Sequence, residues 1–190
     1  MNNKFKELMN LGINGNKMIR LLISTIKTHE LMENEYINRI ESYIPKEKFI
    51  NSKKKSNYIN YLEKNFFSIL LLSIFKNHKI SKESIIEYGV ILHSLRGMVT
   101  CTDNIIDNES KGSIFLTEIS NHILSNNMLS IIEQNILNDS ISKLTTDSYK
   151  KNQMLQGYTK ALYSVAIGES MRELHDKIET PKEIIENIHK

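Results

Sequence analysis

The chain has 190 residues, of which 40% are hydrophobic and 25% are charged, and its formal net charge is +3. This length suits one domain with a sizeable core, and the chain has only two prolines and seven glycines, so we expect a single all-α domain over residues 1–190. The mild positive charge argues against a nucleic-acid partner, because the one run of basic residues is Lys53-Lys54-Lys55.

Cysteine usage and hydropathy bear on the compartment. The single Cys101 excludes an intramolecular disulfide and fits a reducing environment. The first residues lack the apolar core of a signal peptide. The longest apolar run, over residues 66–75, is about half of a membrane span. We therefore expect a cytoplasmic protein without a transmembrane segment.

The first part of the chain is predicted to form one short and one long helix. The short helix covers residues 3–10 and ends at the glycines of residues 12–15. The long helix covers residues 16–43, where apolar residues keep helical spacing; it could break at residues 33–34, and Pro45 ends it.

Two helices with different patterns follow a polar connection over residues 46–57, which has room for one helical turn. The helix over residues 58–78 is apolar nearly all round, so we expect it to be buried on every side at the centre of a bundle. The next helix begins after Ser81, which we expect to act as its N-cap, and ends near residues 108–112.

The remaining chain is predicted to be helical as well. A helix over residues 114–138 directs apolar residues toward the core and could bend at residues 125–127. Residues 139–144 form a short turn or helix, and a last long helix covers residues 147–177. A capping box with proline then starts a further helix at Thr180.

The helix after Ser81 carries a polar stripe about 80° wide, at 100° per residue. The residues of this stripe are His93, Arg96, Thr100, Asp103 and Asp107. On the opposite side lie Ile91, Leu95, Met98, Thr102, Ile105 and Ile106. Arg96 is the only charged residue between Tyr88 and Cys101. A polar face of small side chains fits a helix that lines a cavity as well as one that faces solvent, so both interpretations stay open.

Asp103 and Asp107 are the candidate metal ligands on this stripe. Carboxylates at positions i and i+4 stand one turn apart and repel each other unless a cation lies between them. Two aspartate oxygens in this arrangement suit Mg²⁺, which completes its octahedron with water and phosphate oxygens. Such a site would hold a diphosphate and neutralise the charge that grows on it as it leaves.

Residues 92–109, Leu-His-Ser-Leu-Arg-Gly-Met-Val-Thr-Cys-Thr-Asp-Asn-Ile-Ile-Asp-Asn-Glu, resemble a known motif. It is the first aspartate-rich motif, Asp-Asp-x-x-Asp, of the class I trans-prenyltransferases, which are the polyprenyl diphosphate synthases. Asn104 stands where the family has its second aspartate. The family's metal ligands are mainly the first and last positions, which here are Asp103 and Asp107.

The resemblance spans about residues 55–190 and implies an isoprenoid-synthase-like helical bundle. It implies a Mg²⁺-dependent transferase of isoprenoid biosynthesis, which condenses an allylic diphosphate with isopentenyl diphosphate, and usually a homodimer. Lys111 would be the counterpart of the basic residues that follow the family's aspartates, and Arg96 is a further candidate contact for the diphosphate. Met98 and Val99 hold the positions that limit product length in the family.

Two more positions come from the resemblance. Gly168-Glu169 occupies the place of the family's Gly-Gln, whose helix carries acidic residues facing the cavity, although Glu169, Arg172, Glu173 and Asp176 also fit a salt-bridged surface. Lys190 would be the lysine of the family's substrate-binding Lys-Thr pair.

The chain also departs from the family. It lacks the Gly-Lys-x-x-Arg-Pro stretch that grips diphosphate, for which only Lys64 is available. Its sequence stops before the second aspartate-rich motif, so we expect a truncated domain that is inactive by itself. A terpene cyclase of the same fold and a non-catalytic helical subunit that pairs with a related synthase are the alternative functions.

Overall fold

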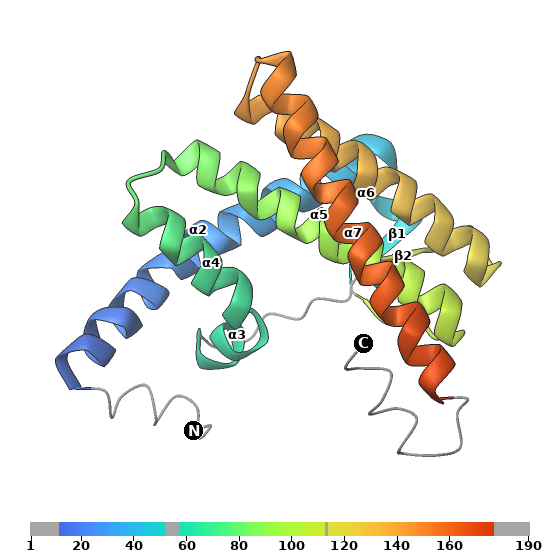
Figure 1. Cartoon of the computed structure of the whole chain (residues 1–190), viewed down its shortest axis with the longest axis horizontal. Helices are drawn as coiled ribbons and strands as arrows, with labels where there is room; N and C mark the ends of the chain where they lie inside the picture. Colours follow the sequence, from blue (N-terminus) through green and yellow to red (C-terminus); the bar gives the residue numbers. More distant parts are fainter. Residues whose placement is uncertain (1–11, 52–57, 113, 177–190) are drawn as a thin grey trace. The chain divides into compact units, whose positions relative to one another are not determined.

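The computed structural model describes the backbone of residues 12–51, 58–112 and 114–176, and side chains for residues 17, 19–51, 60–112 and 114–171. This part of the chain is predominantly helical, with six α-helices, which confirms the all-α prediction (Figure 1). The chain divides into two units, Met1–Thr146 and Asp147–Lys190. None of the described helices has a stretch that is long and apolar enough to cross a membrane.

The first described helix, α2 (Gly12–Tyr43), is longer than predicted. The glycines at residues 12–15 lie within it and do not end it, and no break occurs at residues 33–34. A glycine costs a helix only about 1 kcal/mol, and α2 gains more from the face it buries. Six residues of this face are at most 1% exposed: Leu22, Thr25, Ile26, His29, Met32 and Ile40. The short helix predicted over residues 3–10 lies outside the described residues.

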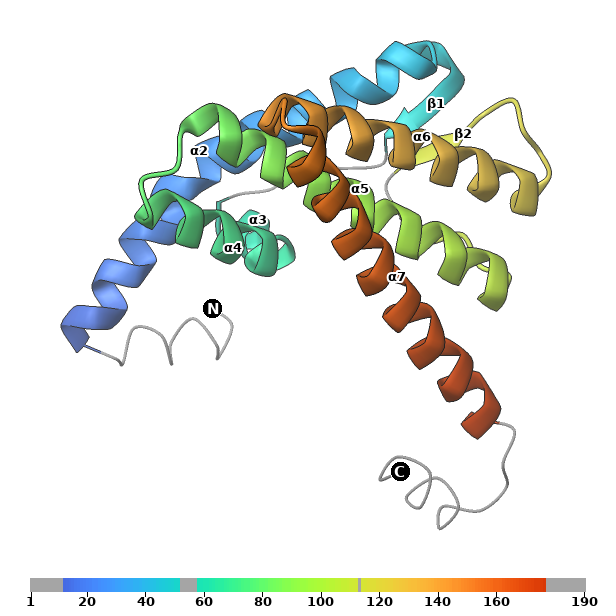
Figure 2. The same ribbon diagram turned by 45° about the horizontal axis from the view of Figure 1, so that its top comes forward.

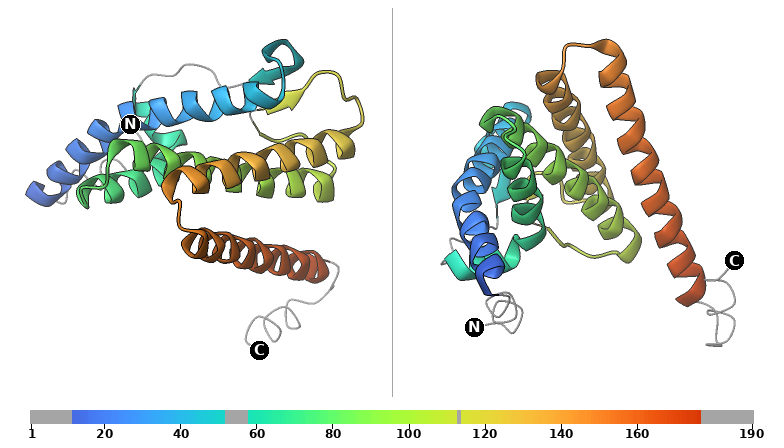
Figure 3. Two further views of the ribbon diagram at one scale, coloured as in Figure 1. Left: turned by 90° about the horizontal axis from the view of Figure 1, so that it is seen from above. Right: turned by 60° about the vertical axis from the view of Figure 1, so that its left-hand side comes forward.

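A small two-stranded sheet joins segments that are distant in the sequence. After Pro45 the 3₁₀ turn Lys46–Lys48 leads into β1 (Phe49–Asn51), which pairs antiparallel with β2 (Ile114–Leu116). The sheet lies beside the C-terminal end of α2 (Figure 3). Sequence analysis assigned Ile114–Leu116 to a helix, because three residues are too few to show the alternation of a strand.

The apolar segment predicted as one helix over residues 58–78 is two helices, α3 (Tyr58–Lys64) and α4 (Phe66–Asn77). Asn65 separates them, and its side-chain Nδ2 donates to the carbonyl oxygen of Tyr61 at 3.1 Å. This competition for a helical carbonyl is typical of asparagine. The segment is not buried on every side, since Phe67 is 83% exposed.

Helix α5 (Lys82–Asp107) is central to the first unit, because α2, α4 and α6 (His122–Leu144) all pack against it (Figure 2). Its predicted N-cap is confirmed: Ser81 Oγ accepts a hydrogen bond from the backbone N–H of Ser84 at 3.1 Å. At the other end Asn108 takes a left-handed conformation with φ 51° and stops the helix.

Helix α6 begins later and ends later than predicted. Asn121 caps it by accepting from the N–H of Leu124 at 2.9 Å. It continues through residues 125–127 and through residues 139–144 without a break. Of the apolar residues predicted to face the core, four are buried, whereas Ile123 and Leu124 are more than half exposed. The buried four are Leu129, Ile132, Ile136 and Leu137.

Two groups of buried side chains form the core of the first unit. The larger one joins α2, β1, α4, α5 and α6. The smaller one joins α2 to α3 and α4. Arg39 is buried beside the larger group, and its guanidinium donates hydrogen bonds to Glu35, Glu87 and Ser140. These contacts fix α2, α5 and α6 relative to one another.

The second unit contains α7 (Ser148–Asp176), which agrees with the helix predicted over residues 147–177. Asp147 begins it by accepting from the backbone N–H of Tyr149 at 2.9 Å. The helix predicted to start at Thr180 lies outside the described residues.

Candidate functional site

The two aspartates of the stripe meet a shared cation at the C-terminal end of α5. Lys111 Nζ lies 3.6 Å from Asp103 Oδ2 and 3.4 Å from Asp107 Oδ2, and it pairs with Glu109 Oε2 at 2.6 Å. We call these four residues the carboxylate site. The two aspartate side chains are 33% and 30% exposed, so they are accessible from solvent. The hydrogen bond to Glu109, with the nearby aspartates, raises the pKa of Lys111 above its usual range.

Asn104, which the resemblance matches to the family's second aspartate, holds the loop that carries Lys111. Its Oδ1 accepts from the backbone N–H of Lys111 at 2.9 Å, and its Nδ2 donates to the Lys111 carbonyl at 2.8 Å. Nδ2 also donates to Asn126 Oδ1 on α6 at 3.0 Å. Asn104 is 4% exposed. It therefore holds Lys111 and the turn in place, and it is not part of the exposed carboxylate face.

A pocket of about 400 Å³ opens between α3, α4 and α5, and we call it the Arg96 pocket. Its apolar lining comes from Phe67, Leu71 and Leu92, and its cationic groups are Lys64 and Arg96. Asn65, Ser68 and His93 complete the lining.

The Arg96 pocket and the carboxylate site share one face of α5. Arg96 and Asp103 are two turns apart on the same stripe, so about 10 Å of helix axis separates them. The stripe itself is divided, because His93 is 8% exposed whereas Arg96 is exposed. It thus lines a pocket at one end and meets solvent at the other.

The structure separates the two positions that the resemblance links to product length. Met98 is 8% exposed and lies on the side of α5 away from the aspartates. Val99 is half-buried and shares the aspartate side.

The remaining predicted site residues, Glu169 and Lys190, belong to the second unit. Glu169 lies on α7, in the second unit, and its role facing a cavity stays a prediction. The side chains of Arg172, Glu173 and Asp176, and all of Lys190, lie outside the described residues.

Sequence analysis missed a chain of polar side chains through the core. The ring of His93 lies 5.7 Å from that of His29 and 5.3 Å from that of Tyr36, measured between centroids. The hydroxyl of Tyr36 donates to Glu133 Oε1 on α6. The sequence does contain one signal for these contacts. His29 and Tyr36 fall on the apolar stripe of α2, where a buried polar side chain requires a hydrogen-bond partner.

Glu133 is the most perturbed acid of this chain of contacts. It is 3% exposed. Burial raises its pKa to about 7, and the hydrogen bond from Tyr36 opposes part of this effect. Glu133 is therefore ready to gain or lose a proton near neutral pH.

Comparisons of this chain with known protein families, with curated proteins and with solved structures gave no match.

Proposed function

We propose that this protein binds an allylic diphosphate through Mg²⁺ held by Asp103 and Asp107, and that it is a prenyltransferase of the polyprenyl diphosphate synthase type. Its second substrate would be isopentenyl diphosphate. The function would belong to isoprenoid biosynthesis.

The observation that carries the proposal is the contact of one cation with both aspartates. Lys111 Nζ approaches Asp103 and Asp107 to within 3.6 Å. A positive centre between two carboxylates is what an i, i+4 pair requires. The ammonium occupies the place that a metal ion would take. Mg²⁺ suits this place because it binds carboxylate oxygens together with water, and both aspartate side chains are accessible from solvent.

The Arg96 pocket supports an amphiphilic ligand. Lys64 and Arg96 supply positive charge for phosphate oxygens, while Phe67, Leu71 and Leu92 supply apolar surface for a hydrocarbon chain. A volume of about 400 Å³ lies within the range of small-molecule sites. Because this pocket lies on the aspartate face of α5, a ligand there can direct its head group toward the carboxylate site.

Each group then has a defined task. Asp103 and Asp107 would hold the ion, which would supply charge neutralisation for the departing diphosphate. Lys111 would pair with the diphosphate oxygens once the aspartates bind the ion. Ionisation breaks the bond between the allylic carbon and the diphosphate oxygen, which keeps the electron pair. The double bond of isopentenyl diphosphate would attack the allylic carbon, and the resulting carbocation would lose a proton to the released diphosphate, which restores a double bond in the lengthened chain.

Asn104 supports this assignment by its position. In a family that has aspartate at this place, an asparagine reduces the charge of the motif. Here its amide makes three hydrogen bonds to the loop and to α6. An aspartate would lose the two in which Nδ2 donates, and its charge would be buried. The substitution is thus compatible with a metal site that uses Asp103 and Asp107.

The test is calorimetric titration of a non-hydrolysable allylic diphosphate analogue with and without Mg²⁺. We expect binding that requires Mg²⁺ and that weakens at least tenfold in Asp103→Asn/Asp107→Asn. The matched control is Asp139→Asn, an exposed aspartate on α6 that should leave the affinity unchanged. Equal binding by the double variant, or no Mg²⁺-dependent binding by the wild type, would refute the proposal and favour a non-catalytic partner subunit.

A further inference from the structure

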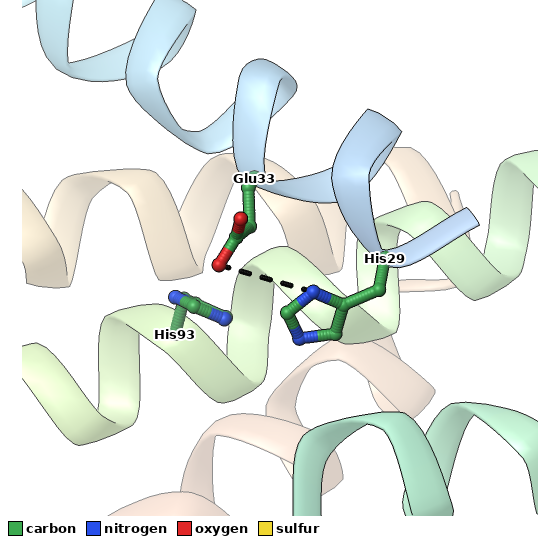
Figure 4. Close-up of side chains that lie close together, drawn as sticks. All are labelled: His29, Glu33 and His93. Atoms are coloured by element: carbon green, nitrogen blue, oxygen red, sulfur yellow. Dashed lines mark ion pairs between the residues drawn. The ribbon is translucent and has the colours of Figure 1, made fainter. Parts of the chain in front are cut away.

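A second candidate metal site lies inside the first unit, between α2 and α5. His29 and Glu33 project from α2 and His93 projects from α5, and the three side chains point toward one another (Figure 4). We call these residues the His29 cluster. Their ligand atoms all lie within 4.8 Å of one another. The side chain of His29 is fully buried, that of Glu33 is 15% exposed, and His93 is 8% exposed.

Two imidazoles and one carboxylate select a particular class of metal. Imidazole nitrogen suits Zn²⁺ and the divalent ions of iron, cobalt and nickel, whereas Mg²⁺ and Ca²⁺ prefer all-oxygen sites. A tetrahedral Zn²⁺ with bonds of about 2.0–2.2 Å holds its ligand atoms about 3.3–3.6 Å apart. Ligand atoms that lie up to 4.8 Å apart would therefore have to approach one another by as much as about 1.2–1.5 Å when the ion binds.

Both ring nitrogens of His29 have hydroxyl partners in the protein without a metal ion. Its Nε2 lies 2.7 Å from Ser68 Oγ, and Ser68 Oγ donates to the carbonyl of Asn65 at 2.9 Å. Because Ser68 donates its hydroxyl hydrogen to Asn65, Ser68 Oγ accepts from Nε2 of His29. His29 Nδ1, which lies 3.8 Å from Glu33 Oε1, donates to the hydroxyl of Tyr61, because that hydroxyl gives its own hydrogen to Glu33, so a metal ion on Nδ1 would take the place of this proton. The bond from Nε2 to Ser68 would then hold the ring in place, as the second N–H of a metal-bound histidine usually does.

Tyr61 places a fourth oxygen beside the cluster. Its hydroxyl lies 2.7 Å from His29 Nδ1 and donates to Glu33 Oε2 at 2.8 Å. This oxygen lies within hydrogen-bond distance of two of the three ligands, so it is a candidate for the fourth ligand of a tetrahedral site.

The Arg96 pocket gives the cluster access to solvent. Ser68 and His93 line this pocket, and both belong to the cluster or to its hydrogen-bonded support. An ion can therefore reach the buried ligands without unfolding of the bundle. The carboxylate site lies farther along α5 and shares no residue with the cluster.

We propose that His29, Glu33 and His93 bind a divalent transition-metal ion of the Zn²⁺ class, which cross-links α2 to α5 at the base of the Arg96 pocket. The ion would stabilise the bundle where its core is most polar. This site is independent of the Mg²⁺ site proposed at Asp103 and Asp107.

The experiment titrates Co²⁺, and then competing Zn²⁺, into the chelator-treated full chain and follows the visible absorption of bound Co²⁺. We expect one equivalent to bind, Zn²⁺ to displace it, and Zn²⁺ to raise the melting temperature. The conservative variants Glu33→Gln and His93→Gln should each weaken binding at least tenfold. The exposed-histidine control His78→Gln and the double variant Asp103→Asn/Asp107→Asn should bind as the wild type does.

The outcomes decide between this site and its rivals. No stoichiometric binding by the wild type would overturn the proposal, as would binding that survives both cluster variants. Loss of binding in His78→Gln or in the aspartate double variant would assign the metal elsewhere. X-ray absorption of the wild-type Co²⁺ complex must show two imidazole ligands. This readout decides the matter even if a cluster variant fails to fold.

Discussion

The buried carboxyl group of Glu133 makes the stability of the protein depend on pH. In the folded state burial raises its pKa to about 7 from an ordinary value of 4.5. Each tenfold change in proton affinity is worth about 1.4 kcal/mol. Ionised Glu133 therefore lowers the free energy of unfolding by about 3 kcal/mol relative to its protonated form.

The sign follows from which state holds the proton. Well below pH 4.5 the carboxyl is protonated in both the folded and the unfolded chain, and its favourable contribution is fully present. As the pH rises, the unfolded chain releases the proton first, and stability falls until the folded carboxyl ionises near pH 7. At higher pH the loss is complete and constant.

The perturbation is Glu133→Gln, which keeps the size of the side chain and an acceptor for the hydroxyl of Tyr36. The free energy of unfolding is measured by urea denaturation from about pH 5 to about pH 8. We expect the free energy of unfolding of the variant, relative to that of the wild type, to rise by about 2.5 kcal/mol between these two pH values. Groups that titrate in both proteins cancel in the difference. Parallel curves for the two proteins, like those expected for the exposed control Glu30→Gln, would refute the reasoning.

Two further substitutions test the packing around the site by urea denaturation. Asn104→Ala removes the three hydrogen bonds that hold the Lys111 loop and should lower the free energy of unfolding by about 1–3 kcal/mol. The control Asn127→Ala, on the exposed side of α6, should lower it little. Equal losses in the two variants would contradict the role of Asn104. Gly97→Ala places a methyl group 2.5 Å from Glu133 Oε1 and should destabilise by about 1–3 kcal/mol. The control is Gly157→Ala, where the added methyl group meets nothing within 4 Å and should stabilise the protein by up to about 1 kcal/mol. A gain in stability at both glycines would show that Glu133 is not packed against α5.

Local signals in the sequence predicted the helices and one of the caps. Ser81 was identified because an N-cap bonds to a backbone N–H three residues away. The apolar spacing of α2 and α5 is likewise a short-range pattern. The two aspartates could be grouped because both lie on one helix.

Features that depend on distant contacts were not predictable in this way. The hydrogen bonds of Asn104 could not be predicted, because its partner Asn126 is 22 residues away on another helix. The strand Ile114–Leu116 exists only through its pairing with Phe49–Asn51. His29 and His93 lie on α2 and α5, so their approach follows from the packing of two helices. Sequence periodicity carries none of this information.

The most direct test of the proposed function locates the divalent ion on the chain. Mn²⁺, which replaces Mg²⁺ and broadens nearby nuclear magnetic resonance signals, is added in the presence of the allylic diphosphate analogue. We predict that the backbone signals of Asp103, Asp107 and Lys111 broaden first, only when the diphosphate is present, and not in Asp103→Asn/Asp107→Asn. Broadening centred elsewhere, or none at the end of α5, would contradict the assignment of the metal site to these two aspartates.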